Sequence, residues 1–360
     1  MANQLDTVQS QTIKWMRYPL MLLIVLIHTD TPLLNSMPQW GVSAAFYYMM
    51  QTILTLAVPM FFIFSGYWFF RNTETFTFED YTSKLKKRVM TIFVPYVIWN
   101  YFAWAFQMFV VCLQGHADWI PKDVFTPQNI LDVIVGWSEG YQGMPKAFQL
   151  WFLRDMLVVC LLAPQLYLLL KGRKPYILLI FAAIYLLPGV QSWHPIIKRF
   201  PSALLFFSIG AYMGIHKQNM VEMVRRVPMW LSIIVTTLLL ALSIWQCMTY
   251  GRYISLAKNA FSIVSVIPAL QIASMMVERF SLKPTAFIAD SNFFLFALHP
   301  LIMNYLLVEP LANHFTNTPF HFWLVYFMEL IVPAIVCVIL YAIMHRFMPR
   351  TTNLLTGGRS

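Results

Sequence analysis

The chain of 360 residues carries too few charges for a soluble protein: 59% of its residues are hydrophobic and 11% are charged. Soluble domains are about a quarter charged. The formal net charge of +10 does not indicate nucleic-acid binding, because the basic residues lie in short segments between apolar runs and form no basic arm. The apolar runs have the length that crosses a bilayer, and lipid leaves unpaired backbone groups unsatisfied. The composition therefore predicts an all-α, polytopic membrane protein.

About ten apolar segments are expected to cross the membrane as helices. In chain order they are residues 15–34, 44–70, 89–113, 150–170, 175–190, 201–216, 229–248, 258–277, 286–307 and 322–345. The fifth and sixth are short, and Pro188 with Gly189 is expected to break that pair. The whole chain, residues 1–360, is expected to be one integral-membrane domain with short tails at about 1–14 and 346–360.

The positions of Lys and Arg predict that both termini are cytoplasmic. If the N-terminus is inside, most of the 25 Lys and Arg residues fall in connections and tails on that side, as the positive-inside rule requires. The longest connection on the outside is residues 114–149, which contains Trp119, Trp137 and Tyr141. These side chains either stack on a sugar or form an interfacial aromatic belt, and both interpretations stay open.

The sequence shows no sign of a disulfide framework, a metal site or a soluble type of hydrolase. All four cysteines, Cys112, Cys160, Cys247 and Cys337, lie within apolar segments, so buried free thiols are expected. There is no GxxxxGK[ST] phosphate loop, no GxSxG elbow and no HExxH motif.

Arg17 and His28 are the first and last residues of the apolar stretch "RYPLMLLIVLIH" in the first segment. On a helix they lie roughly 16 Å apart along the axis, on the same face. Ionisable groups inside a membrane are costly and usually face a cavity. The alternatives are that Arg17 is a snorkelling anchor and that His28 is a neutral ring hydrogen-bonded between helices.

Other polar groups accompany this pair in the apolar segments. Lys84, Lys86, Lys87 and Arg88 precede the third segment, where they are a positive-inside cluster or a binding patch for a phosphorylated ligand. Each of the remaining polar residues could also form an interhelical hydrogen bond. They are Ser65 and Tyr67, which flank Gly66, the adjacent pair Arg154 and Asp155, and the separate residues Asp290, His299 and Glu329.

These residues form a pattern that resembles the family-three membrane acyltransferases. Arg17 and His28 resemble the R-x10-H signature of that family, and "VPMFFIFSGYWFF" resembles its second-span motif. Weaker likenesses are "KKRVMTIFVPY" before the third span, "LWFL" at 150–153 and "SNFFLFALHPLI" at 291–302. Where the family pattern has a histidine before the Leu-Trp pair, this chain has Gln149.

The resemblance implies a multi-pass enzyme of the bacterial cytoplasmic (inner) membrane. Such enzymes move an acyl group, often acetyl from cytoplasmic acetyl-CoA, onto a hydroxyl of a cell-surface glycan or lipid-linked saccharide. The function predicted for this chain is therefore that of an O-acyltransferase that binds no nucleic acid and requires no metal. Two other functions stay open, a proton-coupled secondary transporter or flippase and a sensory or scaffold domain.

On this hypothesis the polar residues take three roles. His28 and Arg17 are the catalytic pair, because an imidazole can remove the hydroxyl proton and a guanidinium can hold a phosphate of the donor. The donor is also expected to contact Ser65, Tyr67, Lys86, Lys87 and Arg88. The acceptor is expected to contact Trp151, Asp155 and His299. About 16 Å between Arg17 and His28 suits a partly extended pantetheine arm.

Overall fold

The computed structural model describes residues 2–29, 41–72, 75–138, 141–172, 175–187, 193–250, 256–283, 285–308 and 318–358. These residues form helices joined by turns, with no β-strand among them, which confirms the predicted all-α class. The helices are α1 (Ala2–Ile27), α2 (Val42–Leu54), α3 (Ala57–Phe70), α4 (Phe78–Arg88), α5 (Val94–Leu113), α6 (Pro127–Val135), α7 (Trp151–Leu161), α8 (Ala163–Leu170), α9 (Tyr176–Leu186), α10 (Phe200–Ile215), α11 (Met220–Arg225), α12 (Met229–Tyr250), α13 (Leu256–Val264), α14 (Val266–Phe280), α15 (Ala286–Ile302), α17 (Pro319–Phe347) and α18 (Pro349–Thr356).

Within the residues that the structure describes, four short segments of other helical types interrupt or join these helices. Two are π-helical, η2 (Val89–Phe93) between α4 and α5 and η7 (Met303–Val308) after α15. The other two are 3-10 turns, η3 (Ala117–Trp119) and η5 (Phe148–Leu150). The π-helical segments are informative because single π-turns are rare and are frequent at functional sites.

Six helical stretches in the described part of the chain are long and apolar enough to cross a membrane, or seven if the pair Phe148–Leu161 and Ala163–Leu170, bent by 62°, is one span. The expected number of about ten is therefore not confirmed. The segments 175–190 and 201–216 yield the shorter apolar helices α9 and α10, and the first half of α1 is polar. The side on which the termini lie stays a prediction.

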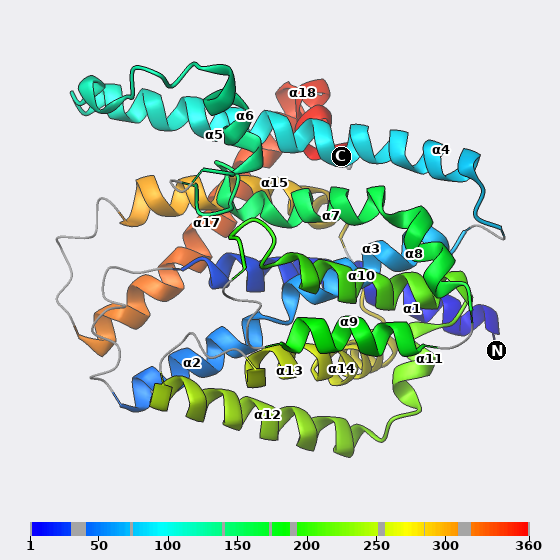
Figure 1. Cartoon of the computed structure of the whole chain (residues 1–360). Helices are drawn as coiled ribbons and strands as arrows, with labels where there is room; N and C mark the ends of the chain where they lie inside the picture. The colour runs from blue at the N-terminus through cyan, green and yellow to red at the C-terminus, as the bar shows by residue number, and fades with distance from the viewer. Residues whose placement is uncertain are drawn as a thin grey trace.

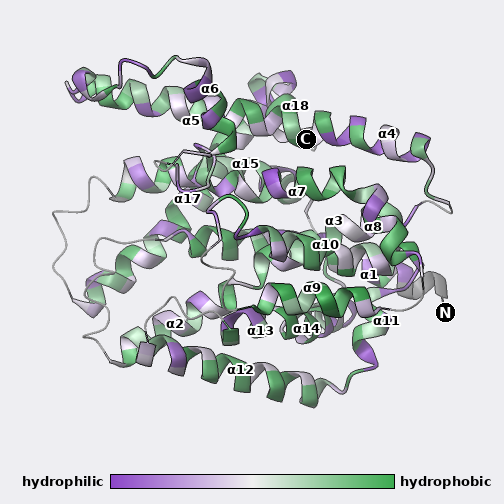
Figure 2. Ribbon diagram, viewed as in Figure 1, coloured by the Kyte–Doolittle hydropathy of each residue, from purple (hydrophilic) through white to green (hydrophobic). Residues whose placement is uncertain are grey.

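The outer surface of the bundle is apolar, as expected for a protein surrounded by lipid. Figure 1 shows α4 and α5 along one side of the bundle and α12 along the opposite side, and Figure 2 shows hydrophobic residues along α12. Large side chains of α12, among them Trp230, Leu238 and Trp245, are exposed. Three of the cysteines are buried as predicted, but the prediction is wrong for Cys112, which is exposed because it lies on the outer face near the end of α5.

The centre of the bundle depends on a close crossing of α3 and α10. A Cβ built on Gly66 would lie 2.1 Å from the carbonyl oxygen of Phe207, and one on Gly210 would lie 1.9 Å from that of Ile63. Only glycine permits this approach, as in other membrane helix pairs. The glycine in the second-span motif therefore has a packing role, and it fixes the face of α3 that carries Ser65.

Candidate active site

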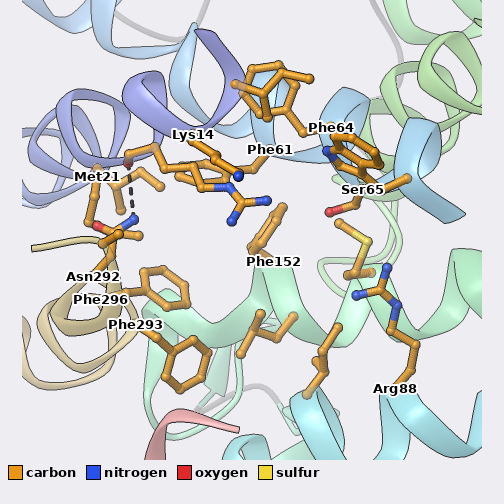
Figure 3. A pocket seen from close by; sticks show the side chains of 18 of the residues that line it. Lys14, Met21, Phe61, Phe64, Ser65, Arg88, Phe152, Asn292, Phe293 and Phe296 are labelled. Atoms are coloured by element: carbon orange, nitrogen blue, oxygen red, sulfur yellow. Dashed lines mark hydrogen bonds between the residues drawn. The ribbon is translucent and has the colours of Figure 1, made fainter. Parts of the chain in front are cut away.

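A cavity of about 490 Å³ lies between α1, α3, the α4–η2 junction, α7 and α15. Figure 3 shows Lys14, Ser65 and Arg88 pointing into it from different helices. Its lining consists of Ser10, Ile13, Lys14, Arg17, Met21, Ile24, Phe61, Phe64, Ser65, Trp68, Arg88, Ile92, Phe152, Leu153, Met156, Ala289, Asn292, Phe293 and Phe296. The volume is within the range of sites for small molecules and cofactors, roughly 300–1,000 Å³.

One part of this cavity is strongly cationic. Lys14, Arg17 and Arg88 line it, and no Asp or Glu is among its described lining residues. Lys14 and Arg17 lie three residues apart on α1 and so share a face. Arg88 enters from the last turn of α4, with its guanidinium 5.9 Å from the ring of Phe69. Uncompensated cations in a confined site favour an anionic ligand, and guanidinium groups favour phosphate.

The rest of the cavity wall is aromatic and apolar. Phe61, Phe152, Phe293 and Phe296 line it, and the rings of Phe61 and Phe152 lie 6.1 Å apart. Asn292 joins two walls, because its Nδ2 donates to the backbone carbonyl of Arg17 at 3.2 Å. This hydrogen bond holds α15 against α1 beside the cation. The cavity therefore offers a phosphate-binding end and an apolar path.

Beyond that path two histidines lie face to face, His28 directly after the end of α1 and His299 within α15. The rings of His28 and His299 are stacked with their centroids 5.5 Å apart and an interplanar angle of 28°. The edge of Phe148 packs on His28 at 4.9 Å. His299 is fully buried, and its Nδ1 lies 3.0 Å from the carbonyl oxygen of Leu295. Because a carbonyl can only accept, this bond requires the proton on Nδ1 and leaves the Nε2 lone pair of a neutral ring available.

The cavity ends about one helical turn before this histidine pair. Ile24 lines the cavity and precedes His28 by four residues, which is roughly 6 Å along α1. Phe296 likewise lines the cavity and precedes His299 by three residues on α15. His28 does not line the cavity, so the cavity that Arg17 lines does not extend as far as His28.

Comparison with known proteins identifies the family. A family model described as an acyltransferase domain matches residues 11–342. The chain belongs to this acyltransferase family. It is also similar to the succinoglycan biosynthesis protein ExoH of Rhizobium meliloti (strain 1021), with 24% identity over 373 residues, covering 99% of this chain and 94% of that protein. No solved structure matches.

Within the acyltransferase, the expected donor-binding residues separate into two groups. Arg17, Ser65 and Arg88 line the cavity. Lys86 and Lys87 are exposed on α4 and do not line it, because successive residues of a helix point about 100° apart. Tyr67 does not line it either: its ring is buried, and its hydroxyl accepts from Gln9 Nε2 at 2.7 Å. Tyr67, Lys86 and Lys87 therefore lie outside this cavity, and their contact with a donor stays a prediction.

The residues predicted to bind the acceptor also fall into two groups. His299 joins His28, but Trp151 and Asp155 do not line the cavity. Asp155 is buried and accepts from Arg154 Nε at 3.1 Å, and Arg199 lies 5.6 Å from the ring of Trp151. Arg154 in turn donates to the carbonyl oxygens of Val135 and Gly143, both at 2.9 Å. This cluster holds connecting segments together away from the cationic cavity, and the contact of Asp155 and Trp151 with an acceptor stays a prediction.

Trp119 and Trp137 of the segment 114–149 contact histidine rings of the acyltransferase and do not line the cavity. Trp119 stacks on His116 at 3.9 Å, and Trp137 stacks on His194 at 4.8 Å. Both tryptophans are exposed. Neither the sugar-stacking interpretation nor the interfacial interpretation is decided by these contacts.

Three residues of the site were not predicted from the sequence. Lys14 was assigned to the edge of a tail, although its spacing of three from Arg17 places it on the same helical face. Asn292 follows the serine of the motif at 291–302, which is a weak signal. Phe148 had no signal, because its contact with His28 depends on the tertiary arrangement.

Proposed function

We propose that the protein is an O-acyltransferase that takes an acyl group, in the first instance acetyl, from cytoplasmic acyl-CoA and transfers it to a hydroxyl of a cell-surface glycan or lipid-linked saccharide. One observation carries the proposal: a cavity lined by three cations, with no carboxylate among its described lining residues, ends about one turn from a stacked pair of histidines, of which His299 is fully buried. The family and the relative named for succinoglycan biosynthesis support acyl transfer to a polysaccharide.

The charge and polarity of the cavity lining support an acyl-CoA donor. Its phosphates would lie at Lys14, Arg17 and Arg88, where charge-assisted hydrogen bonds are strongest. The pantetheine arm would follow the aromatic wall toward Ile24. About 16 Å of α1 between Arg17 and His28 matches a partly extended arm, so the thioester approaches the histidines while the nucleotide stays at the cations.

The proposed reaction is direct transfer. His28 removes the proton of the acceptor hydroxyl, the hydroxyl oxygen bonds to the thioester carbonyl carbon, and the carbon–sulfur bond breaks. The thiolate of CoA leaves and takes up the proton from His28, which restores the neutral ring. His299 positions His28 by ring contact, and its own tautomer is set by the Leu295 carbonyl. Positioned acid–base catalysis contributes about 10²–10⁴-fold.

The aromatic end of the cavity implies a rearrangement during the reaction. Phe152 and Phe296 line the cavity at the level just before the histidines. In the proposal their side chains change rotamer when the donor binds, which admits the thioester and excludes water from the reacting groups.

The test uses purified full-length protein in lipid nanodiscs with radiolabelled acetyl-CoA and a membrane glycolipid extract. Label in an extractable saccharide, lost on mild base treatment that cleaves esters, supports the proposal. Label that stays on the protein as an acid-stable adduct at histidine would replace direct transfer by a two-step route. Proton-coupled uptake of the extract into vesicles without acetyl transfer would favour the transporter alternative.

A further inference from the structure

A second pocket lies on the far side of the histidine pair from the cationic cavity. Its volume is about 230 Å³, and its walls are α5, the segment around η5, and the junction of α15 with η7. The lining residues are Ala103, Gln107, Lys146, Ala147, Phe148, Gln149, Pro300, Leu301, Asn304 and Tyr305. None of these residues lines the cationic cavity.

Two chain segments run from one cavity to the other and pass the histidines on the way. On α15 the cationic cavity is lined as far as Phe296, the second pocket begins at Pro300, and His299 lies between them. Along η5 and α7, Phe148 lines the second pocket and Phe152 lines the cationic cavity. Phe148 is also the residue whose ring contacts His28. The two hollows therefore approach the same pair of imidazoles from opposite directions.

The second pocket presents neutral hydrogen-bonding groups rather than a cluster of charges. Gln107, Gln149 and Asn304 supply three amides, and Lys146 supplies the one formal charge among its described lining residues. Amides both donate and accept, as sugar hydroxyls do. Tyr305 adds an aromatic ring, packed at 5.3 Å on Phe106. The volume is below the roughly 300–1,000 Å³ of sites for drug-sized ligands, so one sugar ring suits it better than an oligosaccharide.

Gln149 places a buried amide in the wall of this pocket. The side chain is buried, and its Nε2 donates to the carbonyl oxygen of Ala297 at 2.7 Å. Its Oε1 is buried without a hydrogen-bond partner among the described residues. A buried acceptor without a partner is costly, and a ligand hydroxyl would satisfy it. The π-helical η7, which carries Asn304 and Tyr305, adds to the evidence because such segments are frequent at functional sites.

We infer that this second pocket binds the acceptor, a single sugar unit of the glycan or lipid-linked saccharide, and presents its hydroxyl to His28. The inference rests on the proposed O-acyltransferase function and assigns its acceptor site. Gln107, Gln149 and Asn304 bind the ring hydroxyls. Lys146, whose pKa is lowered by burial, is a donor beside them.

The experiment compares matched substitutions in full-length protein, with acetyl-CoA and the glycolipid extract as substrates. Ala103→Phe fills the pocket and Asn304→Leu removes an exposed amide at its wall, whereas Ala105→Phe adds the same bulk to an exposed position of α5 outside it. We expect Asn304→Leu to raise the KM for the extract about tenfold, the effect of one to two lost hydrogen bonds, and Ala103→Phe to raise it by at least as much because the new ring occupies the pocket. We expect acetyl-CoA binding to be unchanged in all three variants.

The outcomes separate this inference from the proposed function. If the parent transfers acetyl and Asn304→Leu has the parental KM for the extract, the pocket is not the acceptor site, although the protein remains an acyltransferase. The same conclusion follows if Ala103→Phe and Ala105→Phe behave alike. If the parent transfers no acetyl, the proposed function itself fails. Asn304 is exposed, so its variant keeps the test valid where Ala103→Phe fails to fold.

Discussion

Replacing Arg17 by Gln is expected to weaken acetyl-CoA binding strongly without destabilising the protein. Arg17 is exposed to the cavity, makes no ion pair among the described residues, and shares the cavity with Lys14 and Arg88. A hydrogen bond to a charged group contributes about 1.5–3 kcal/mol. Since about 1.4 kcal/mol corresponds to a factor of ten, the Kd should rise by about 10–150-fold.

The same substitution is expected to leave the ligand-free protein as stable as before, or more stable. Three cations in one cavity repel one another when no anion is bound, and Gln removes one of them. A residue whose role is structural would behave in the opposite way, with a lower thermal midpoint and unchanged binding. The two measurements together therefore distinguish a ligand-binding arginine from a snorkelling anchor.

The assay is titration calorimetry with acetyl-CoA on protein in nanodiscs, followed by thermal unfolding of the ligand-free samples. Arg88→Gln is the parallel variant, and Lys86→Gln with Lys87→Gln is the control, because those lysines are exposed on the same helix outside the cavity. The control should change the Kd by less than about twofold, the effect of screened surface charges. A Kd for Arg17→Gln within twofold of the parent, in folded protein, would refute the assignment of this cavity to the donor.

Three other substitutions test the site and its scaffold. His28→Ala should lower kcat by about 10²–10⁴-fold with little change in acetyl-CoA binding; activity within a few-fold of the parent would remove His28 from the chemistry. Gly210→Ala should lower the thermal midpoint, since its Cβ would lie 1.9 Å from a carbonyl oxygen of α3 and overpacking costs about 1–3 kcal/mol. Gly172→Ala is the control, because a Cβ at Gly172 would have no atom within 4 Å. Equal midpoints for the two variants would contradict the close crossing of α3 and α10. Asp155→Ala should destabilise by about 3 kcal/mol by breaking a buried ion pair, with an unchanged KM for the extract, and a raised KM in a stable variant would restore its predicted acceptor role.

The sequence was sufficient for features whose causes are local. Apolar runs predicted the helical membrane class, because a backbone in lipid must pair within its own segment. The apolar surroundings of Arg17 made a cavity the reasonable expectation for the arginine, and Arg17 lines one. The glycine beside Ser65 was compatible with tight packing, which the crossing of α3 and α10 confirms.

Features that depend on helix rotation and on partners could not be predicted. Successive residues of a helix point in different directions, so not all of Lys86, Lys87 and Arg88 can face one cavity. The sequence does not specify which of the three does. The contact between His28 and His299 joins the first helix to α15, and no local pattern specifies it. No sequence pattern predicted the π-helical segments η2 and η7, yet η2 supplies a residue to the cationic cavity and η7 supplies residues to the second pocket.

The separation of the two hollows by the histidine pair has a chemical consequence. A continuous water-filled channel between them would expose the thioester to hydrolysis, and water would compete with the sugar hydroxyl for His28. The rings of Phe148, Phe152 and Phe296 lie at the levels where the hollows end, and His299 is fully buried among its neighbours. In the proposed reaction the donor and the acceptor enter from opposite sides and meet across the imidazoles, of which His299 is fully buried, so that water has little access to the thioester. On this arrangement the acyl carbon moves a short distance past a fixed histidine, and the nucleotide of the donor never has to leave the cations that hold it.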